Sequence, residues 1–284
     1  MSSLKAYKNK GRKNLRGIAA FAALVLVTIA MLLPVYYMVI TSLKTTKELM
    51  QFPPTLLPKE VAWRNYITIF SKINYLAFYK NSLIVSIVST LGMTISSSLV
   101  AFGLARYNTR GKNLIFMIII STLLLPYPAI IIPQFLVFHK FGWINTFFPL
   151  IVPAFFGSAY NIFLLRQFFT TIPDDLFEAA RIDGSSEFRS YWNLAIPLCK
   201  PALATVAIFQ FLWTWNDLIN PVIYLNSESK FTLPIGMSSF FSNFRIIPWN
   251  LIMVGNILAL VPILIVFFKA QNYFVEGITI SGIK

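Results

Sequence analysis

Charged and aromatic residues gather in one polar stretch between Ile172 and Pro197, which separates two long apolar runs. Thr171 is expected to cap a first helix here, with Pro173 in its first turn, where a missing N–H costs nothing. Gly184 is expected to end that helix, because glycine takes the left-handed conformation without a steric penalty. The stretch therefore predicts two short helices joined at a glycine.

The second helix carries three aromatic side chains and is expected to begin with a serine cap, Ser185 or Ser186. Phe188, Tyr191 and Trp192 occur at i, i+3 and i+4, so they share one helix face. Burying a large apolar side chain contributes roughly 1.5–3 kcal/mol, so this face needs a cover. Two covers are open: a partner protein, or the ends of this protein's own helices.

The composition is that of an integral membrane protein. Of the 284 residues, 57% are hydrophobic and only 12% are charged, against about 25% charged in soluble proteins. The single Cys199 excludes a cysteine cluster or disulfide framework, and the single His139 excludes a pair of histidine ligands. The sequence also lacks a P-loop, so we expect no catalytic residue, cofactor or metal in this chain.

Six apolar runs predict six transmembrane helices in a lipid bilayer, with both termini in the cytoplasm. The net charge of +14 is spread over tails and loops, which does not indicate nucleic-acid binding. The connection after the first run carries as many basic residues as the N-terminal tail, so the later loops set the orientation. The predicted parts are a basic cytoplasmic tail (1–16), a first transmembrane helix (17–43), an extracytoplasmic connection (44–77), a transmembrane core (78–273) with a cytoplasmic loop (170–200), and a cytoplasmic C-terminal tail (274–284).

Two predicted spans contain residues that are unusual in a membrane helix. Pro126, Pro128 and Pro133 interrupt the third span (113–138), either as a kink or as part of a gate. Asp217 falls within the fifth span (201–223). A carboxylate near a span centre costs about 2.5–3.5 kcal/mol, so it is expected to face protein or water.

Asp217 has polar and aromatic neighbours that could line a path for a sugar. The predicted path residues are Asp217, Asn216, Trp213 and Asn220. In the alternative interpretation, the tryptophans form an interfacial belt and Asp217 holds two helices together.

The polar stretch contains Glu178-Ala179-Ala180, then Gly184, then Leu194-x-Ile196-Pro197. This order resembles the EAA loop of permease subunits of binding-protein-dependent ABC importers. The residues around it, including Trp213-x-Trp215-Asn216-Asp217, resemble the carbohydrate-uptake, MalG-like branch of that family. The resemblance covers the whole chain and is densest from Gly142 to Pro221.

The resemblance implies an all-α type I ABC importer permease core in the bacterial cell membrane that works by alternating access. The implied partners are a second homologous permease subunit, two ATP-binding subunits that hold the ATP, and an extracytoplasmic solute-binding protein; the implied cargo is a sugar or oligosaccharide. The residues it implies for ATPase coupling are Glu178, Ala179, Ala180, Gly184, Phe188 and Tyr191. Glu178 would be a polar anchor or, alternatively, a solvated helix charge. The tail from Gly277 to Lys284 resembles an extension that inserts between the ATPase subunits.

Two functions from other classes remain as alternatives. A stand-alone channel or ion-coupled carrier would need charge pairs within the membrane, for which Asp217 is the one candidate. A non-transporting membrane scaffold would use the EAA-like loop to recruit a soluble protein without moving a substrate.

Overall fold

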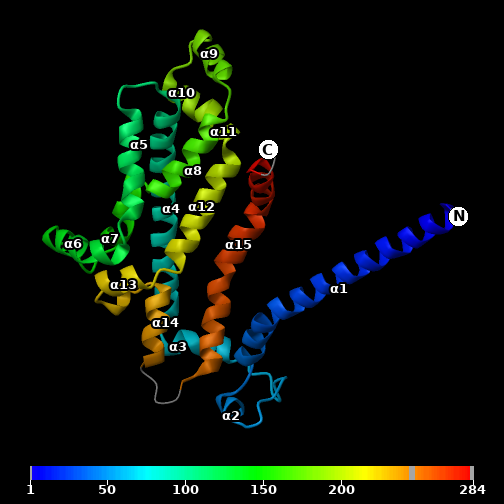
Figure 1. The fold of residues 1–284 in the computed structure, drawn as a ribbon. Helices are drawn as coiled ribbons and strands as arrows, with labels where there is room; N and C mark the ends of the chain where they lie inside the picture. The colour runs from blue at the N-terminus through cyan, green and yellow to red at the C-terminus, as the bar shows by residue number, and fades with distance from the viewer. Residues whose placement is uncertain (1, 243–246, 282–284) are drawn as a thin grey trace. The chain divides into compact units, whose positions relative to one another are not determined.

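The protein is described by a computed structural model that covers residues 2–242 and 247–281, with side chains described for 17–18, 20–240 and 247–271. Every regular element in these residues is a helix, as predicted (Figure 1). The chain divides into two compact units, one of residues 1–72 with 244–258 and one of residues 73–243 with 259–284. Each unit is described by itself.

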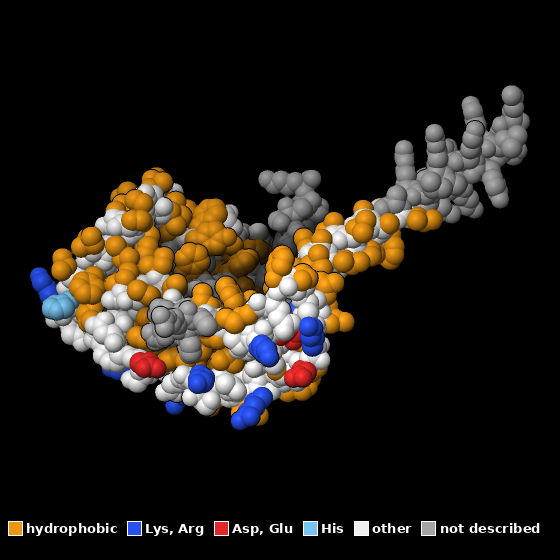
Figure 2. Space-filling model, turned by 90° about the horizontal axis from the view of Figure 1, so that it is seen from below, with side chains coloured by type: hydrophobic (Ala, Val, Ile, Leu, Met, Phe, Trp, Pro, Cys, Tyr) orange, Lys and Arg blue, Asp and Glu red, His pale blue; other side chains and the backbone are white. Residues whose placement is uncertain are grey.

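The first unit contains a long N-terminal helix, two short helices and the first part of the last helix. They are α1 (Ser2–Ser42), α2 (Thr46–Leu49), α3 (Asn65–Lys72) and the start of α15 (Trp249–Ser281). Large apolar side chains of α1 are exposed along its described length, as expected of a helix that faces lipid (Figure 2). The span within α1 runs from Ala20 to Ser42, close to the predicted 17–43.

A buried polar cluster holds the connection after α1 together. The Glu48 carboxylate accepts hydrogen bonds from the Thr55 hydroxyl at 2.6 Å and from the Lys59 backbone N–H at 3.1 Å. The Lys44 ammonium donates to the Thr55 carbonyl. Chiefly through the Thr55 hydrogen bond, this environment lowers the pKa of Glu48 below its usual value.

We expect Glu48→Gln to loosen residues 44–60. Because the folded pKa is lowered, the ionised carboxylate stabilises this segment at neutral pH, and that contribution is lost as the pH falls through the folded pKa. Replacing a charge-assisted hydrogen bond by a neutral one costs about 1 kcal/mol, or roughly fivefold faster trypsin cleavage within the segment at pH 7. Glu60→Gln, at an exposed position, is the control; equal cleavage rates for both variants would contradict the prediction.

The second unit is built around α4 (Tyr75–Arg106), which packs mainly against α8 (Ala159–Thr170) and α12 (Lys200–Trp215) (Figure 1). Small residues of α4 also let residues 148–156, just before α8, approach it closely. A Cβ on Gly92 would lie 2.6 Å from the Phe155 ring, and the Ser89 hydroxyl donates to the Leu150 carbonyl at 3.0 Å. Helix α4 starts six residues before the predicted second span (81–105), within the predicted connection (44–77).

The other elements of the second unit are shorter, and several are single turns. In chain order they are α5 (Lys112–Ser121), η1 (Thr122–Leu124), α6 (Tyr127–Lys140), α7 (Phe148–Ile151), η2 (Val152–Phe156), α9 (Asp174–Ile182), α10 (Glu187–Ser190), the π-helical turn η3 (Tyr191–Ala195), α11 (Ile196–Leu198), α13 (Ile219–Tyr224), η4 (Glu228–Lys230) and α14 (Leu233–Ser242).

Two candidate spans are bent pairs of helices, and the second pair begins within the predicted cytoplasmic loop (170–200). Lys112–Leu124 and Tyr127–Lys140 meet at 101°, and Glu187–Leu198 and Lys200–Trp215 meet at 81°. Together with four unbroken apolar helices, they give up to six spans within the described residues. The predicted fifth span (201–223) was wrong in one respect: α12 ends at Trp215, and α13 is separate. The 101° bend lies at Pro126. Proline has no backbone N–H, so it cannot donate the hydrogen bond that would continue the helix.

The last helix is longer than predicted. α15 continues through the predicted boundary at 274 to Ser281. The side chains of the tail that begins at Gly277, and all of residues 282–284, lie outside the described residues.

Candidate functional site

The polar stretch predicted from the sequence folds as α9, a turn and α10, and we call residues 172–198 the EAA segment. The start of α9 differs from the prediction. The Thr171 hydroxyl donates to the Phe168 carbonyl at 2.7 Å, in the helix before it, and Pro173 lies one residue before α9. Thr171 therefore ends α8 and does not cap α9, and the start of α9 is held by an ion pair described below.

Gly184 ends α9 as predicted. Its φ is +78°, its N–H donates to the Arg181 carbonyl at 3.1 Å, and the Ser185 N–H donates to the Ala180 carbonyl at 2.9 Å. These two bonds form a Schellman motif, which satisfies the last carbonyls of the helix. Ser186 then caps α10 by accepting from the Arg189 N–H at 3.3 Å.

The predicted coupling residues on α9 lie on the surface of this chain. Glu178, Ala179 and Gly184 are exposed, and Ala180 is half-buried. Within the described residues, Glu178 forms no ion pair. Its carboxylate lies on the surface, where a partner can reach it.

The three aromatic residues after the turn do not share one environment. Tyr191 is only 2% exposed, whereas Phe188 is 66% exposed. The Tyr191 and Ser98 hydroxyls form a 2.5 Å hydrogen bond. Tyr191, predicted as a contact for an ATPase, thus has its side chain in this protein's own core. Trp192 is exposed, so a partner is needed only for Phe188 and Trp192.

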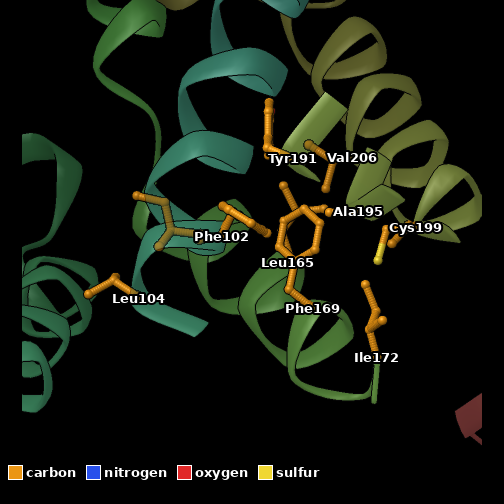
Figure 3. Packing of buried hydrophobic residues seen from close by; sticks show 12 residues of the cluster. Phe102, Leu104, Leu165, Phe169, Ile172, Tyr191, Ala195, Cys199 and Val206 are labelled. Carbon is orange, nitrogen blue, oxygen red and sulfur yellow. The ribbon is translucent and has the colours of Figure 1, made fainter. Parts of the chain in front are cut away.

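The core beneath the EAA segment joins α4, α8 and η3. Figure 3 shows Phe102, Leu165, Phe169 and Tyr191 converging there. The Phe102 ring lies 5.7 Å from Phe169, 5.9 Å from Phe177 and 5.2 Å from Tyr191, measured between centroids. Phe102 thus contacts three segments that lie more than 60 residues after it in the sequence.

Sequence reasoning missed the residues of α4 that hold the EAA segment. Ser98, Phe102 and Arg106 occur at i, i+4 and i+8, so they form one stripe near the end of α4. Arg106 forms an ion pair with Asp174 at the start of α9. The sequence did contain a pattern that could have indicated these residues: a hydroxyl, an aromatic and a basic residue at helical spacing near the end of an apolar span.

A second contact links the end of α4 to α10. The Tyr107 hydroxyl donates to the Glu187 carboxylate at 3.4 Å, and the Arg181 guanidinium donates to the same carboxylate at 2.7 Å. Burial, and then the nearby Glu187 charge, raise the pKa of Tyr107 above its usual value. The phenol therefore stays protonated at neutral pH and remains a donor.

A polar junction joins the two broken spans on the other side of the core. The Asp217 carboxylate accepts from the Asn220 backbone N–H at 3.2 Å and from the Asn220 side-chain amide at 2.7 Å. The Tyr127 hydroxyl donates to the Asn220 amide oxygen. Asp217 and Asn220 follow the break after α12, and Tyr127 follows the break before α6.

The other two predicted path residues are not part of this junction. Trp213 is 75% exposed, and the Asn216 amide donates to the Leu212 carbonyl of its own helix at 2.8 Å. The structure thus brings together Asp217 and Asn220 and adds Tyr127. Both bonds to Asp217 come from Asn220, three residues further on, and the contact between the two segments is the one from Tyr127 to Asn220.

Residues 93–280 match the family described as "Binding-protein-dependent transport system inner membrane component". The match covers more than half of the chain. The chain belongs to this family. As a family member with several apolar helices, this inner membrane component is a multi-pass membrane protein.

Two relatives of this inner membrane component cover most of the chain. The "Arabinooligosaccharides transport system permease protein AraQ" of Halalkalibacterium halodurans is 32% identical over 254 residues, which are 88% of this chain and 90% of the relative. The "Probable starch degradation products transport system permease protein AmyC" of Thermoanaerobacterium thermosulfurigenes is 35% identical over 252 residues, which are 88% of this chain and 91% of the relative.

A solved structure is similar to this family member in fold. It is a chain of a bacterial ABC transporter involved in the import of the acidic polysaccharide alginate, with a TM-score of 0.83 and 23% identity. The match covers 92% of this chain and 97% of that chain. The predicted fold, an all-helical ABC importer permease core, is confirmed.

We expect Tyr191→Phe to lower the thermal stability of the purified protein, while Phe188→Leu leaves it unchanged. Tyr191→Phe removes the hydrogen bond to Ser98 in a buried site, which costs about 0.5–1.5 kcal/mol. Phe188 is exposed, so its replacement removes little buried contact. Melting temperatures in detergent would show the difference, and equal melting temperatures would mean that the Tyr191–Ser98 hydrogen bond does not stabilise the fold.

Proposed function

We propose that this inner membrane component is a permease subunit of an ABC importer for a sugar or oligosaccharide. It would form half of the translocation path beside a second homologous permease subunit. ATP would be bound and hydrolysed on two separate subunits, and an extracytoplasmic solute-binding protein would deliver the cargo. Both termini would lie in the cytoplasm. The names of AraQ and AmyC support the choice of cargo.

The observation that carries this proposal is an exposed surface on a firmly seated EAA segment. Apolar side chains of Leu176, Ile182 and Phe188 are exposed there, beside the exposed Glu178 carboxylate. The Schellman turn, the Phe102 cluster and the contacts of Arg106 and Tyr107 hold the backbone beneath them. A rigid surface with an apolar centre and a free carboxylate fits a protein partner, here the ATPase subunit.

The proposed substrate path runs past the junction of Asp217, Asn220 and Tyr127. Breaks in membrane helices are tolerated where the freed backbone groups face protein or a water-filled cavity. The carboxylate, amide and phenol there can exchange hydrogen bonds with sugar hydroxyls, and they need no charged cargo. Trp213 and Asn216 remain candidates for the path because their side chains are exposed.

The two alternative functions differ in what they require. An ion-coupled carrier needs a charge pair within the membrane, and the charged residue of the junction, Asp217, is bonded to a neutral amide. A scaffold would bind the partner without moving cargo, so uptake measurements separate it from a permease.

We expect Glu178→Lys to reduce recovery of the ATPase with this chain. The change reverses the charge of an exposed carboxylate at the centre of the proposed contact, which typically costs at least about tenfold in affinity. Affinity purification of the complete transporter would measure the ATPase recovered. Glu228→Lys, the same change at an exposed site in η4, is the control. Recovery of no ATPase with the wild type would refute the importer proposal.

We expect Asp217→Asn to reduce uptake without changing assembly. The substitution keeps the shape of the side chain but removes the charged acceptor of the two Asn220 hydrogen bonds. We expect this to weaken the junction by about 1 kcal/mol and to lower the rate of uptake by several fold. Uptake of labelled arabino- and malto-oligosaccharides, measured beside ATPase recovery, would test this. Unchanged uptake would exclude the path, whereas loss of assembly would assign Asp217 a structural role.

A further inference from the structure

We propose that Arg106 is the positioning residue through which movement of the EAA segment reaches α4 and, along α4, the loop at its opposite end. This inference rests on the proposed function, because it assumes that an ATPase moves the EAA segment. It adds a specific route within the chain and names the residues at both of its ends.

Arg106 contacts the start of the EAA segment in three ways. Its guanidinium forms the ion pair with Asp174, donates to the Ile172 carbonyl at 2.5 Å, and lies over the Phe177 ring at 4.0 Å from the centroid. A carboxylate, a backbone carbonyl and an aromatic face are thus held by one planar group. A displacement of α9 in any direction therefore changes at least one of these contacts.

The burial of the two partners explains why this contact can transmit movement. The Arg106 side chain is 9% exposed, whereas the Asp174 side chain is 84% exposed. Arg106 is enclosed at the end of α4, while Asp174 lies on the surface at the start of α9. Water does not solvate a buried guanidinium when its partner moves away, so separating the ion pair costs free energy.

A lysine could not replace this arginine. The guanidinium is a rigid planar fork that can donate to two acceptors and stack on a ring at the same time, whereas an ammonium is a flexible point charge. Arg166 offers a comparison within the chain, because its guanidinium lies 4.1 Å from the Phe116 centroid and its Nε–H donates to the Leu104 carbonyl at 3.5 Å. These contacts do not involve the EAA segment.

Helix α4 can carry a displacement over its length. It is continuous for 32 residues and contains no proline. At about 1.5 Å per residue, Asn81 and Arg106 are separated by on the order of 40 Å. It packs against both α8 and α12, and in the proposal it carries the displacement of the EAA segment along its length.

The opposite end of α4 is attached to the loop that contains η4. The Asn81 amide donates to the Ser229 carbonyl at 2.9 Å and to the Phe231 carbonyl at 3.0 Å. The Ser82 hydroxyl accepts from the Leu233 N–H at 2.7 Å. With six spans and both termini predicted in the cytoplasm, the loop after the fifth span (201–223) is extracytoplasmic, so α4 connects the two faces on which partners are proposed to bind.

The test measures the response of the far loop to ATP in the assembled transporter. A fluorophore on Ser229→Cys, an exposed position, reports the loop, and the native Cys199 is buried and stays in place. The assembly is reconstituted in lipid nanodiscs, and fluorescence is compared before and after trapping with ATP and vanadate. No cargo is required.

We expect Arg106→Lys to leave ATPase recovery within about twofold of the wild type but to reduce the ATP-dependent fluorescence change about tenfold, within the usual range of coupling effects. Arg166→Lys is the matched control, with an expected wild-type response. Asp174→Asn removes the same ion pair from its exposed side and is expected to reduce the response in the same direction, with ATPase recovery again measured to show that the variant assembles.

Three results would overturn the proposal or its basis. A wild-type response in both Arg106→Lys and Asp174→Asn would exclude the route through this contact. An equal loss in Arg166→Lys would mean that any arginine in this core has the same effect. Recovery of no ATPase with the wild-type chain would refute the proposed function itself. This outcome is distinguishable from failure of the Arg106 route, in which ATPase is recovered and only the fluorescence comparison fails.

Discussion

The packing of Phe102 against aromatic rings of α8 and of the segments that follow α8 and α4 is the interaction on which the rest of the second unit depends. The ring lies on α4 and contacts Phe169 of α8, Phe177 of α9 and Tyr191 of η3. Apolar burial drives little association between helices within lipid, because lipid tails are themselves apolar. At the ends of the spans, where the chain is exposed to water, burial of the same apolar side chains is strongly stabilising. The EAA segment is therefore held where hydrophobic packing has its greatest effect.

This arrangement separates the aromatic residues of the EAA segment into two roles. Tyr191 faces inward and is fixed by Phe102 and Ser98. Phe188 and Trp192 face outward and contact Tyr191 from its far side. The inner ring thus provides a rigid base for the outer two, and a partner that covers them would contact a surface that is already ordered. Preordering reduces the entropy that binding must overcome.

The breaks in the third and fifth spans follow a different physical rule. Each break frees backbone N–H and C=O groups, which are costly in hydrocarbon unless other groups satisfy them. Asp217 supplies part of this satisfaction by accepting from the Asn220 N–H at the start of α13. Tyr127 then connects the second break to the first. A polar junction in an otherwise apolar protein is thus a consequence of the bends, whether or not cargo passes beside it.

The sequence by itself determined the features that depend on local chemistry. Long apolar runs specify membrane helices, and Gly184 specifies the left-handed turn, because neither depends on a distant residue. The EAA pattern likewise identified the surface segment. Only the tertiary structure decided which aromatic residue is buried, that Arg106 contacts Asp174, and that Tyr127 reaches Asn220. Arg106 and Asp174 are 68 positions apart in the sequence, and Tyr127 and Asn220 are 93 positions apart. Helical spacing carries no information about contacts over such separations. Likewise, the 101° bend depends on how the neighbouring helices satisfy the freed backbone groups, a property of the packed fold that prolines alone do not fix.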